Sequence, residues 1–237
     1  MPQGKLILFP VTIGGELSLS LPQANRELLD SCHTFIVEEV RTARRFLKSA
    51  GYSHAIADTV FMELNEHTDP KSIDNYLDPV LHGENIGLLS EAGLPCVADP
   101  GGLVTRMAQD KSIEVVPLVG PSSLMLTLMA SGLNGQNFAF NGYLPIDRSK
   151  REKTIRSLES RMLKEHQTQL FIEAPYRNNQ LMQSLVATCR DATVICVGCD
   201  LMLPSQFIKS QTAAQWSHAM PDLHKRNTVF AIGEPVN

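Results

Sequence analysis

Residues 90–102 read SEAGLPCVADPGG, a run of small residues, glycines and prolines between an apolar segment at 85–89 and a helical pattern at 103–110. A second run, PLVGPSS at 117–123, also follows a strand-like segment and leads into a helical one. Loops that follow parallel strands meet at the carboxyl edge of the sheet, where open α/β domains bind ligands. Since glycine permits close backbone approach and proline fixes a loop, the two runs predict a binding cleft that offers peptide groups.

The segments around these loops alternate in type. Short apolar runs predict strands, and a 3.6-residue periodicity predicts helices. This alternation predicts an α/β domain with a mainly parallel sheet. In chain order we expect strand 6–9, helix 23–31, strand 34–37, helix 40–50, helix 73–82, strand 85–89, helix 103–110, strand 114–118, helix 123–130 and a closing strand 138–141.

The alternation breaks at residues 144–151, where a proline and a basic run precede a long polar helix over 152–165. We interpret this segment as a linker. The chain is therefore expected to form two lobes, residues 1–144 and residues 145–237. In the second lobe we expect strands at 169–172, 193–197, 207–210 and 228–232, with helices at 179–189 and 213–220.

The composition excludes several classes of protein. Lys+Arg 21 against Asp+Glu 25 gives 21 − 25 = −4, and 43% of the 237 residues are hydrophobic, so neither a disordered acidic tail nor a uniformly basic nucleic-acid wrapper is expected. The apolar runs are too short to span a bilayer, and the N-terminus lacks the pattern of a secretory signal. Five scattered cysteines suit a reducing compartment. A cytoplasmic protein with no membrane partner is expected.

Two patterns that resemble cofactor motifs are interpreted as core. Cys196 and Cys199 form a C-x-x-C in an apolar strand, without the second pair that a zinc site needs, so we expect buried cysteines and no metal. Met125 and Met129 are expected in the core of a helix. The phosphate motifs G-x-G-x-x-G and G-x-x-x-x-G-K-[ST] are absent, which argues against dinucleotide and P-loop enzymes.

Six strings in a fixed order carry a family resemblance, and a seventh, EAPYR at 173–177, is similar to an E-x-P-x-R motif in the second lobe. The chain resembles the tetrapyrrole methylase superfamily, and within it the ribosomal small-subunit RNA methyltransferase I branch, which methylates a cytidine ribose 2′-oxygen. The six strings are LFPVTIG (8–14), VEEVRTARR (37–45), LSEAGLPCVADPG (89–101), VPLVGPSS (116–123), ASGL (130–133) and FNGYLP (140–145).

The resemblance implies a two-lobed class III methyltransferase that uses S-adenosylmethionine and forms a homodimer. The N-terminal lobe would hold the mainly parallel sheet, and the C-terminal lobe a mixed sheet with helices. A neutral cradle of peptide groups suits a cofactor whose sulfonium is positive and whose two ends are polar. Carried over by position, the cofactor-binding residues are Pro10, Gly93, Leu94, Val97, Ser122 and Ser123, with Phe171, Met202 and Gly233 from the second lobe.

A ribose hydroxyl must lose a proton during methyl transfer, and three carboxylates near the predicted cleft are candidate bases: Glu91, Glu39 and Asp99. Structural roles compete with this interpretation. Asp99 precedes a proline and could hold a turn. For Glu38, which ends a strand, we expect a solvated or paired charge.

Arg41, Arg44 and Arg177 are candidate clamps for the phosphates or the acceptor. Arg41 and Arg44 belong to a basic cluster at 41–48, and a second cluster lies at 148–156. Such patches favour ribosomal RNA or the small ribosomal subunit as partner, although a basic run is more commonly a solvated helix face. Arg177 could instead pair with Glu173.

Three departures from the branch concern the substrate. The branch prefers S-D-A-G, E-D-T-R and R-E-L-T-K where this chain has SEAG at 90–93, EEVR at 38–41 and CDLMLP at 199–204. Three functions therefore stay open: a ribosomal RNA 2′-O-methyltransferase, a sibling methylase acting on a tetrapyrrole or a protein side chain, and a non-catalytic protein that binds the cofactor or RNA.

Overall fold

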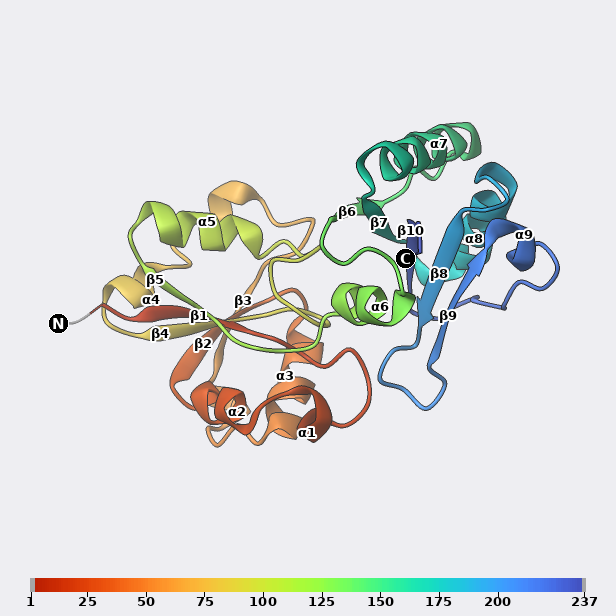
Figure 1. Cartoon of the computed structure of the whole chain (residues 1–237). Coiled ribbons are helices and arrows are strands. Elements are labelled where there is room, and N and C mark those ends of the chain that lie inside the picture. The colour runs from red at the N-terminus through yellow and green to blue at the C-terminus, as the bar shows by residue number, and fades with distance from the viewer. Residues whose placement is uncertain (1–2, 236–237) are drawn as a thin grey trace. The chain divides into compact units, whose positions relative to one another are not determined.

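The computed structural model describes residues 3–235. Its contacts divide the chain into two compact units, Met1–Ser122 and Ser123–Asn237, whose elements are labelled in Figure 1. Each unit has its own sheet and core, so each is described by itself.

The first unit is built on a five-stranded sheet in which every pairing is parallel, in the order β3-β2-β4-β1-β5. The parallel sheet expected from the alternation of segments is thereby confirmed. Successive side chains of a strand point to opposite faces, so Leu6 and Leu8 enter one core cluster and Ile7 and Phe9 the other. The strands are β1 (Lys5–Phe9), β2 (Cys32–Val37), β3 (Val60–Glu63), β4 (Asn85–Leu89) and β5 (Glu114–Pro117).

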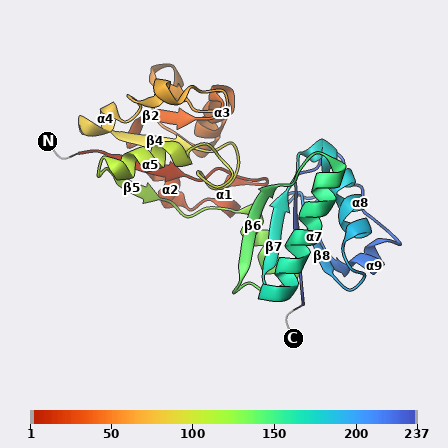
Figure 2. The ribbon, with the colours of Figure 1, turned by 90° about the horizontal axis from the view of Figure 1, so that it is seen from above.

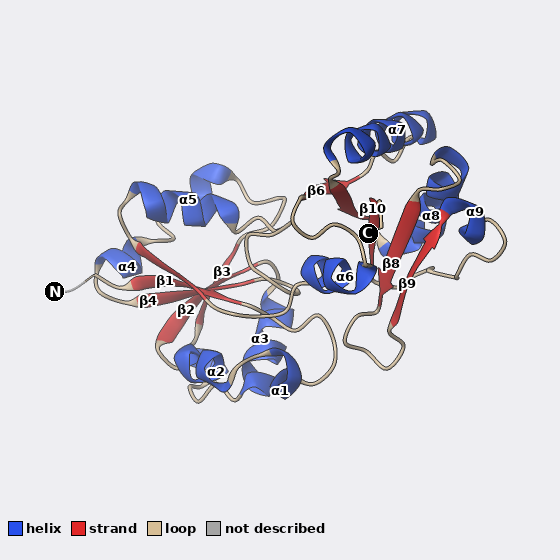
Figure 3. Cartoon of the chain, viewed as in Figure 1, coloured by secondary structure: helices blue, strands red, loops and turns tan. Residues whose placement is uncertain are grey.

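Helices cover both faces of this sheet (Figure 3). One face is covered by η2 (Pro70–Ile73), α4 (Asp78–Leu81) and α5 (Gly102–Asp110), whose buried side chains include Val80 and Val104. The other face carries α2 (Gln23–Leu29) and α3 (Val40–Ala50), which bury Leu29 and Leu47. Two short turns, α1 (Leu17–Ser20) and η1 (Ile56–Asp58), complete the unit.

The connections reverse direction between β1 and β4, which are neighbours in the sheet. The chain leaves β1 toward β2 and leaves β4 toward β5, on the other side of β1. Such a reversal is a topological switch point, where open α/β sheets bind ligands at the carboxyl ends of the strands. The fold therefore brings the loops after β1 and β4 to the position that the glycine-rich and proline-rich runs predict.

The second unit has a mixed five-stranded sheet in the order β6-β7-β10-β8-β9, in which only the β6 and β7 pairing is parallel. Leu124 and Leu128 of α6 pack against one face, and α7, α8 and α9 cover the other around Trp216. Figure 2 shows α7 lying alongside β7. The elements are α6 (Ser123–Ser131), β6 (Phe138–Tyr143), α7 (Arg148–Glu165), β7 (Thr168–Ile172), η3 (Pro175–Arg177), α8 (Asn178–Thr188), β8 (Val194–Cys199), β9 (Phe207–Thr212), α9 (Ala213–Trp216) and β10 (Thr228–Gly233).

The division between the units lies at residues 122 and 123, not at the expected 144 and 145. The strand expected to close the first sheet is β6, and it pairs instead with β7 in the second sheet. The helix before it, α6, packs on β8 and β10. Residues 144–147 are consequently a connection inside the second unit, with Leu144 buried in its core.

Cys196 and Cys199 lie in β8 and are fully buried, as the sequence predicts, and burial raises the pKa of both thiols. The prediction for the methionines is wrong, since Met125 is 38% exposed and Met129 is 79% exposed. The face of α6 that meets the sheet consists of Leu124, Thr127 and Leu128 at helical spacing, which turns Met129 away.

No helix within residues 3–235 has the length and hydropathy needed to cross a membrane. In the same part of the chain, no three His, Cys, Asp or Glu side chains are grouped so that they could hold a metal ion.

Gly198 of β8 lets α6 approach the sheet closely. A Cβ atom at this position would overlap the hydroxyl of Thr127 and lie 3.0 Å from two of its carbons. We expect Gly198→Ala to lower the free energy of unfolding by about 1–3 kcal/mol, because a packed core yields only by shifting the helix. Urea unfolding measures the loss, with Gly135→Ala as control, since no atom lies within 4 Å of the Cβ there.

Candidate active site

The loops that follow β1 and β4 are joined at the switch point. The Val11 N–H donates to the Gly93 carbonyl and the Gly93 N–H donates to the Val11 carbonyl, both at 2.9 Å. The Ser90 hydroxyl also donates to the Gly93 carbonyl, at 3.0 Å. Gly93 is therefore a fixed point of the site, because both of its peptide groups are hydrogen bonded.

Two glycines are required by this geometry. Gly93 has φ +78°, and a Cβ there would meet Ile13 at 3.3 Å and the Pro121 carbonyl at 3.4 Å. Gly120, in the loop after β5, lies so close to Pro10 that a Cβ would overlap the proline ring. The loops after β1, β4 and β5 thus meet around positions where side chains are excluded.

The loop at 94–99 is held in an uncommon conformation. Cys96 and Ala98 adopt left-handed backbone angles, with φ 67° and 57°, which is costly for residues other than glycine and is concentrated at functional sites. The Asp99 carboxylate stabilises the loop by accepting from the N–H of Cys96 at 3.2 Å and of Gly101 at 2.7 Å.

Two residues of this loop have peptide groups that form no hydrogen bond in the described part of the chain. Those of Leu94 and Val97 have no hydrogen-bond partner within residues 3–235, and Val97 is 43% exposed. Pro10 and Gly93 are buried beside them. The first unit therefore brings together four of the residues expected to contact the cofactor. Ser122 and Ser123, both half-buried, stand on either side of the division between the units.

The three carboxylates selected from the sequence already have structural partners. Glu39 is the N-cap of α3 and accepts from the Arg41 N–H at 2.7 Å. Glu91 accepts from the Thr42 hydroxyl at 2.5 Å. Asp99 holds the loop described above, and burial raises its pKa despite those two backbone hydrogen bonds.

Glu38 is the carboxylate that the sequence analysis set aside. It follows β2 directly and lines, with Asp99, Pro100 and Gly101, a cavity of about 10 Å³, enough for roughly one water molecule. Its side chain has no hydrogen-bond partner in the described part of the chain. Burial raises the pKa of Glu38, and the charges of Asp99, Glu91 and Glu66 raise it further. The sequence signal that could have identified Glu38 is its position directly after a strand. Since Glu39 is needed to cap the following helix, Glu38 is the carboxylate left at the strand end.

The basic cluster on α3 is exposed. Arg41, Arg44, Arg45 and Lys48 form no ion pair within residues 3–235, and the guanidinium carbon of Arg44 lies 5.3 Å from the centre of the Phe61 ring. Because α3 begins at the carboxyl edge of the sheet, its first turn carries Arg41 to the same edge as Glu38.

Arg177 lies in the second unit and is paired with Glu173. Its Nε and Nη2 atoms donate to Glu173 Oε1 at 2.9 and 2.6 Å, and the Glu173 side chain is only 1% exposed. The hydrogen bond to Glu173 raises the pKa of Arg177. The structural alternative considered for this residue is therefore present in the structure.

The other second-unit residues expected at the cofactor do not lie together. The Phe171 side chain is fully buried and stacks on Phe230 at 6.1 Å between centroids, so it belongs to the core. Met202 follows β8, whereas Gly233 ends β10 opposite the start of β8. These two positions are separated by the length of a strand, about 17–20 Å.

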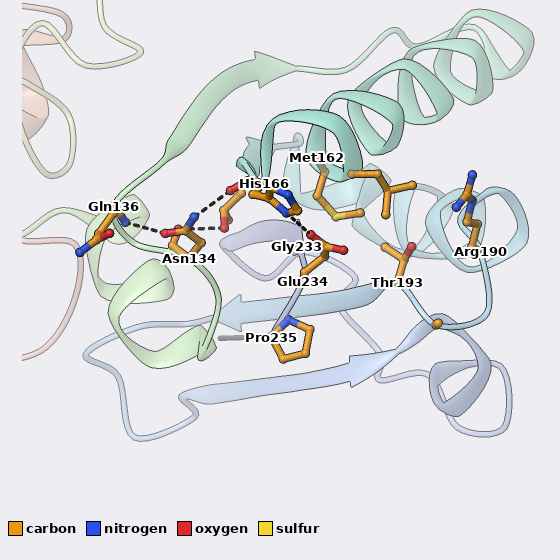
Figure 4. Close-up of a pocket in the computed structure, with 12 residues that line it drawn as sticks. Asn134, Gln136, Met162, His166, Arg190, Thr193, Gly233, Glu234 and Pro235 are labelled. Atoms are coloured by element: carbon orange, nitrogen blue, oxygen red, sulfur yellow. Dashed lines mark hydrogen bonds and ion pairs between the residues drawn. The ribbon is translucent and has the colours of Figure 1, made fainter. Parts of the chain in front are cut away.

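Gly233 instead borders a pocket of about 760 Å³ at the start of β7 and β8 (Figure 4). Its polar groups largely bond one another: Asn134 Nδ2 donates to the His166 carbonyl at 2.7 Å, and His166 Nδ1 lies 2.9 Å from Glu234 Oε2. A Cβ at Gly233 would meet Leu133 at 3.0 Å, so packing explains this glycine.

Solved structures share the fold. The methyltransferase CobJ matches with a TM-score of 0.65 at 14% identity, over 98% of this chain and 94% of that chain. A putative diphthine synthase from Entamoeba histolytica matches with a TM-score of 0.66 at 14% identity, over 100% of this chain and 94% of that one. The chain thus has the two-lobed fold of tetrapyrrole methylase-like methyltransferases, and the expected fold class is confirmed.

Sequence relatives narrow the class. Ribosomal RNA small subunit methyltransferase I of Leptospira borgpetersenii serovar Hardjo-bovis is 30% identical over 239 residues, which is 98% of this chain and 88% of the relative. The protein of that name from Escherichia coli O157:H7 is 27% identical over 199 residues, or 84% of this chain. The chain belongs to the ribosomal RNA small subunit methyltransferase I family, which confirms the resemblance found in its motifs.

The matches span 66% of the length of the Escherichia coli relative and 62% of that from Vibrio cholerae. No protein-family model matches the chain.

Proposed function

We propose that this protein transfers a methyl group from S-adenosylmethionine to a ribose 2′-oxygen of small-subunit ribosomal RNA. The observation that carries the proposal is the 30% identity to a ribosomal RNA small subunit methyltransferase I over 98% of the chain. The loops joined at Val11 and Gly93 support it, because they form a neutral, peptide-lined edge at the switch point.

Residues Pro10, Gly93, Leu94 and Val97 are proposed to line the cofactor site, with Ser122 of the same unit as a further contact. The fit rests on two observations: the space above Gly93 would be narrowed by a Cβ, and the peptide groups of Leu94 and Val97 have no partner in residues 3–235. When bound, S-adenosylmethionine supplies an activated methyl group on a positively charged sulfur. Neutral peptide carbonyls suit this group, since no phosphate has to be bound.

Glu38 is proposed as the general base that accepts the proton lost by the ribose hydroxyl. A carboxylate with a raised pKa is a stronger base, provided that it is ionised at the working pH. Asp99 and Glu91 act on Glu38 through their charges, while their hydrogen bonds hold the loop at 94–99 and the first turn of α3. Glu39 caps α3, and the exposed Arg41 and Arg44 are proposed to contact RNA phosphates.

A homodimer and a cytoplasmic place of action are part of the same proposal. Both follow from the family resemblance, and a substrate in the ribosome requires access to the compartment in which ribosomes assemble. Sedimentation at micromolar concentration tests the dimer directly.

The test is transfer of labelled methyl groups to small ribosomal subunits from a strain that lacks this protein. We expect label in the RNA, as a 2′-O-methylated nucleoside after digestion. Cofactor at a hundredfold excess over Kd should also stabilise the protein by about 2.7 kcal/mol, visible as a higher melting temperature. Label that enters only small molecules or protein would support a sibling methylase, and cofactor binding without transfer to any cell fraction would support a binding protein.

A further inference from the structure

Two exposed tyrosines lie at one edge of the second sheet. Tyr143 ends β6 and pairs in register with Ile172, the last residue of β7. Tyr176 lies in η3, which follows β7 after two residues. Tyr143 is 61% exposed and Tyr176 60%, although aromatic residues make up only 6% of the chain. Both rings are largely in solvent, whereas tyrosine is on average intermediate in burial.

Arg177 supports the Tyr176 ring. Its guanidinium carbon lies 4.9 Å from the centre of the Tyr176 ring, and Nη1 donates to the Tyr176 hydroxyl at 2.7 Å. Buried Glu173 fixes the arginine with two hydrogen bonds, and the arginine in turn orders the Tyr176 ring. An ordered ring loses little conformational freedom when it binds a ligand.

Cations adjoin this surface. The Lys225 N–H donates to the Pro175 carbonyl at 2.9 Å, which sets Lys225 beside η3. The connection from Tyr143 to α7 has four residues, 144–147, so the first turns of α7 lie at the same end of the unit. Lys150 and Lys153 there form no ion pair in the described chain, while the nearby Glu152 is neutralised by Arg148 and Arg156. Other acidic groups at this end are Asp147, the N-cap of α7, and Asp222, together with Glu173 and Asp200, each of which is paired with an arginine.

We propose that Tyr143 and Tyr176 stack on unpaired nucleobases of the RNA substrate, with Lys150, Lys153 and Lys225 near its phosphates. The inference rests on the proposed function and adds a substrate feature to it: the target is read as a single strand. Stacking on exposed aromatic rings, with an arginine plane and flexible lysines at the rim, is the general means by which proteins hold unpaired bases. A second copy of the chain is the competing occupant, but free lysines at the rim favour a polyanion.

The test measures binding of the full chain to a fluorescein-labelled single-stranded RNA and to the same RNA annealed to its complement. Tyr143→Ala and Tyr176→Ala should each weaken single-strand binding about tenfold, because a stacked base is lost. Tyr143→Phe and Tyr176→Phe should retain it, since the ring and not the hydroxyl makes the contact. Affinity for S-adenosylmethionine should be unchanged in all four variants.

Phe138→Ala is the matched control, because Phe138 is an exposed ring at the opposite end of β6, 39% accessible. The proposal would be overturned if both tyrosine-to-alanine variants bound single-stranded RNA as tightly as the wild-type protein, or if the wild-type protein did not bind it. A change in oligomeric state in the alanine variants would assign the surface to a second copy instead. Failure of the proposed function gives a different result. If RNA binding depended on the tyrosines but no methyl group were transferred to RNA, the RNA-binding surface would be supported and the proposed methyltransferase activity would be rejected.

Discussion

Gly93→Val should abolish binding of S-adenosylmethionine, with a loss of affinity of at least about 100-fold. Gly93 adopts φ +78°, a conformation that costs a side-chain-bearing residue about 1–3 kcal/mol and a β-branched one the most. The Cβ would already press on Ile13 and Pro121, and the two methyl groups of valine extend beyond it. Because Gly93 is hydrogen bonded on both sides to Val11, the strain passes to the loops after β1 and β4 together.

Gly102→Val is the matched control. Gly102 is exposed at the start of α5, nine positions along the same segment, and a Cβ there meets no atom within 4 Å. Isothermal titration with the cofactor, alongside a melting curve for each variant, separates loss of the site from loss of the fold. If Gly93→Val bound the cofactor as the wild-type protein does, the site would have to lie away from the joined loops.

The sequence was sufficient for most elements of the first unit, because short apolar strands and helical periodicity are local signals. Two expectations fail there: the edge strand β3 (Val60–Glu63) was not predicted, and the helix expected at 73–82 is replaced by the short turns η2 (Pro70–Ile73) and α4 (Asp78–Leu81). The partner of a strand is not local. The segment that became β6 has the same apolar character as its predecessors, and only its pairing with β7 and the packing of α6 on β8 assign it to the second sheet. The boundary error follows from that one pairing.

At the site, residue type predicted the loops well, since glycine and proline report backbone requirements directly. Side-chain direction was harder to predict. β7 is covered on both faces, so its near-continuous burial gives no alternation from which the inward direction of Phe171 could be inferred. Glu38 and Glu39 differ by one position at the end of β2, and that position decides which carboxylate lines the cavity and which caps α3.

Glu38→Gln should reduce kcat by about 10²- to 10⁴-fold, because a positioned general base contributes an acceleration of that order. The variant keeps the shape of the side chain and cannot accept a proton, so affinity for the cofactor should change little. In the wild-type protein, kcat should rise with pH as Glu38 ionises, along a limb set by its raised pKa. That limb should be absent from the residual activity of the variant. Glu39→Gln is the control, since this neighbour caps α3 and should retain kcat.

The same substitution should make the protein more stable at neutral pH, which distinguishes a base from a structural carboxylate. Burial and the charges of Asp99, Glu91 and Glu66 raise the pKa of Glu38 in the folded state, so the folded protein holds this proton more tightly than the unfolded chain does. As pH rises from the ordinary range of glutamate through the raised folded pKa, the unfolded chain releases the proton first and stability falls. Glutamine removes that loss, so the melting temperature of Glu38→Gln should exceed that of the wild-type protein above the window, with the gap narrowing as pH falls through it. If Glu38→Gln were fully active and less stable at neutral pH, Glu38 would have a structural role. A residue kept for catalysis at a cost in stability should give the opposite results, a lower kcat and a higher stability.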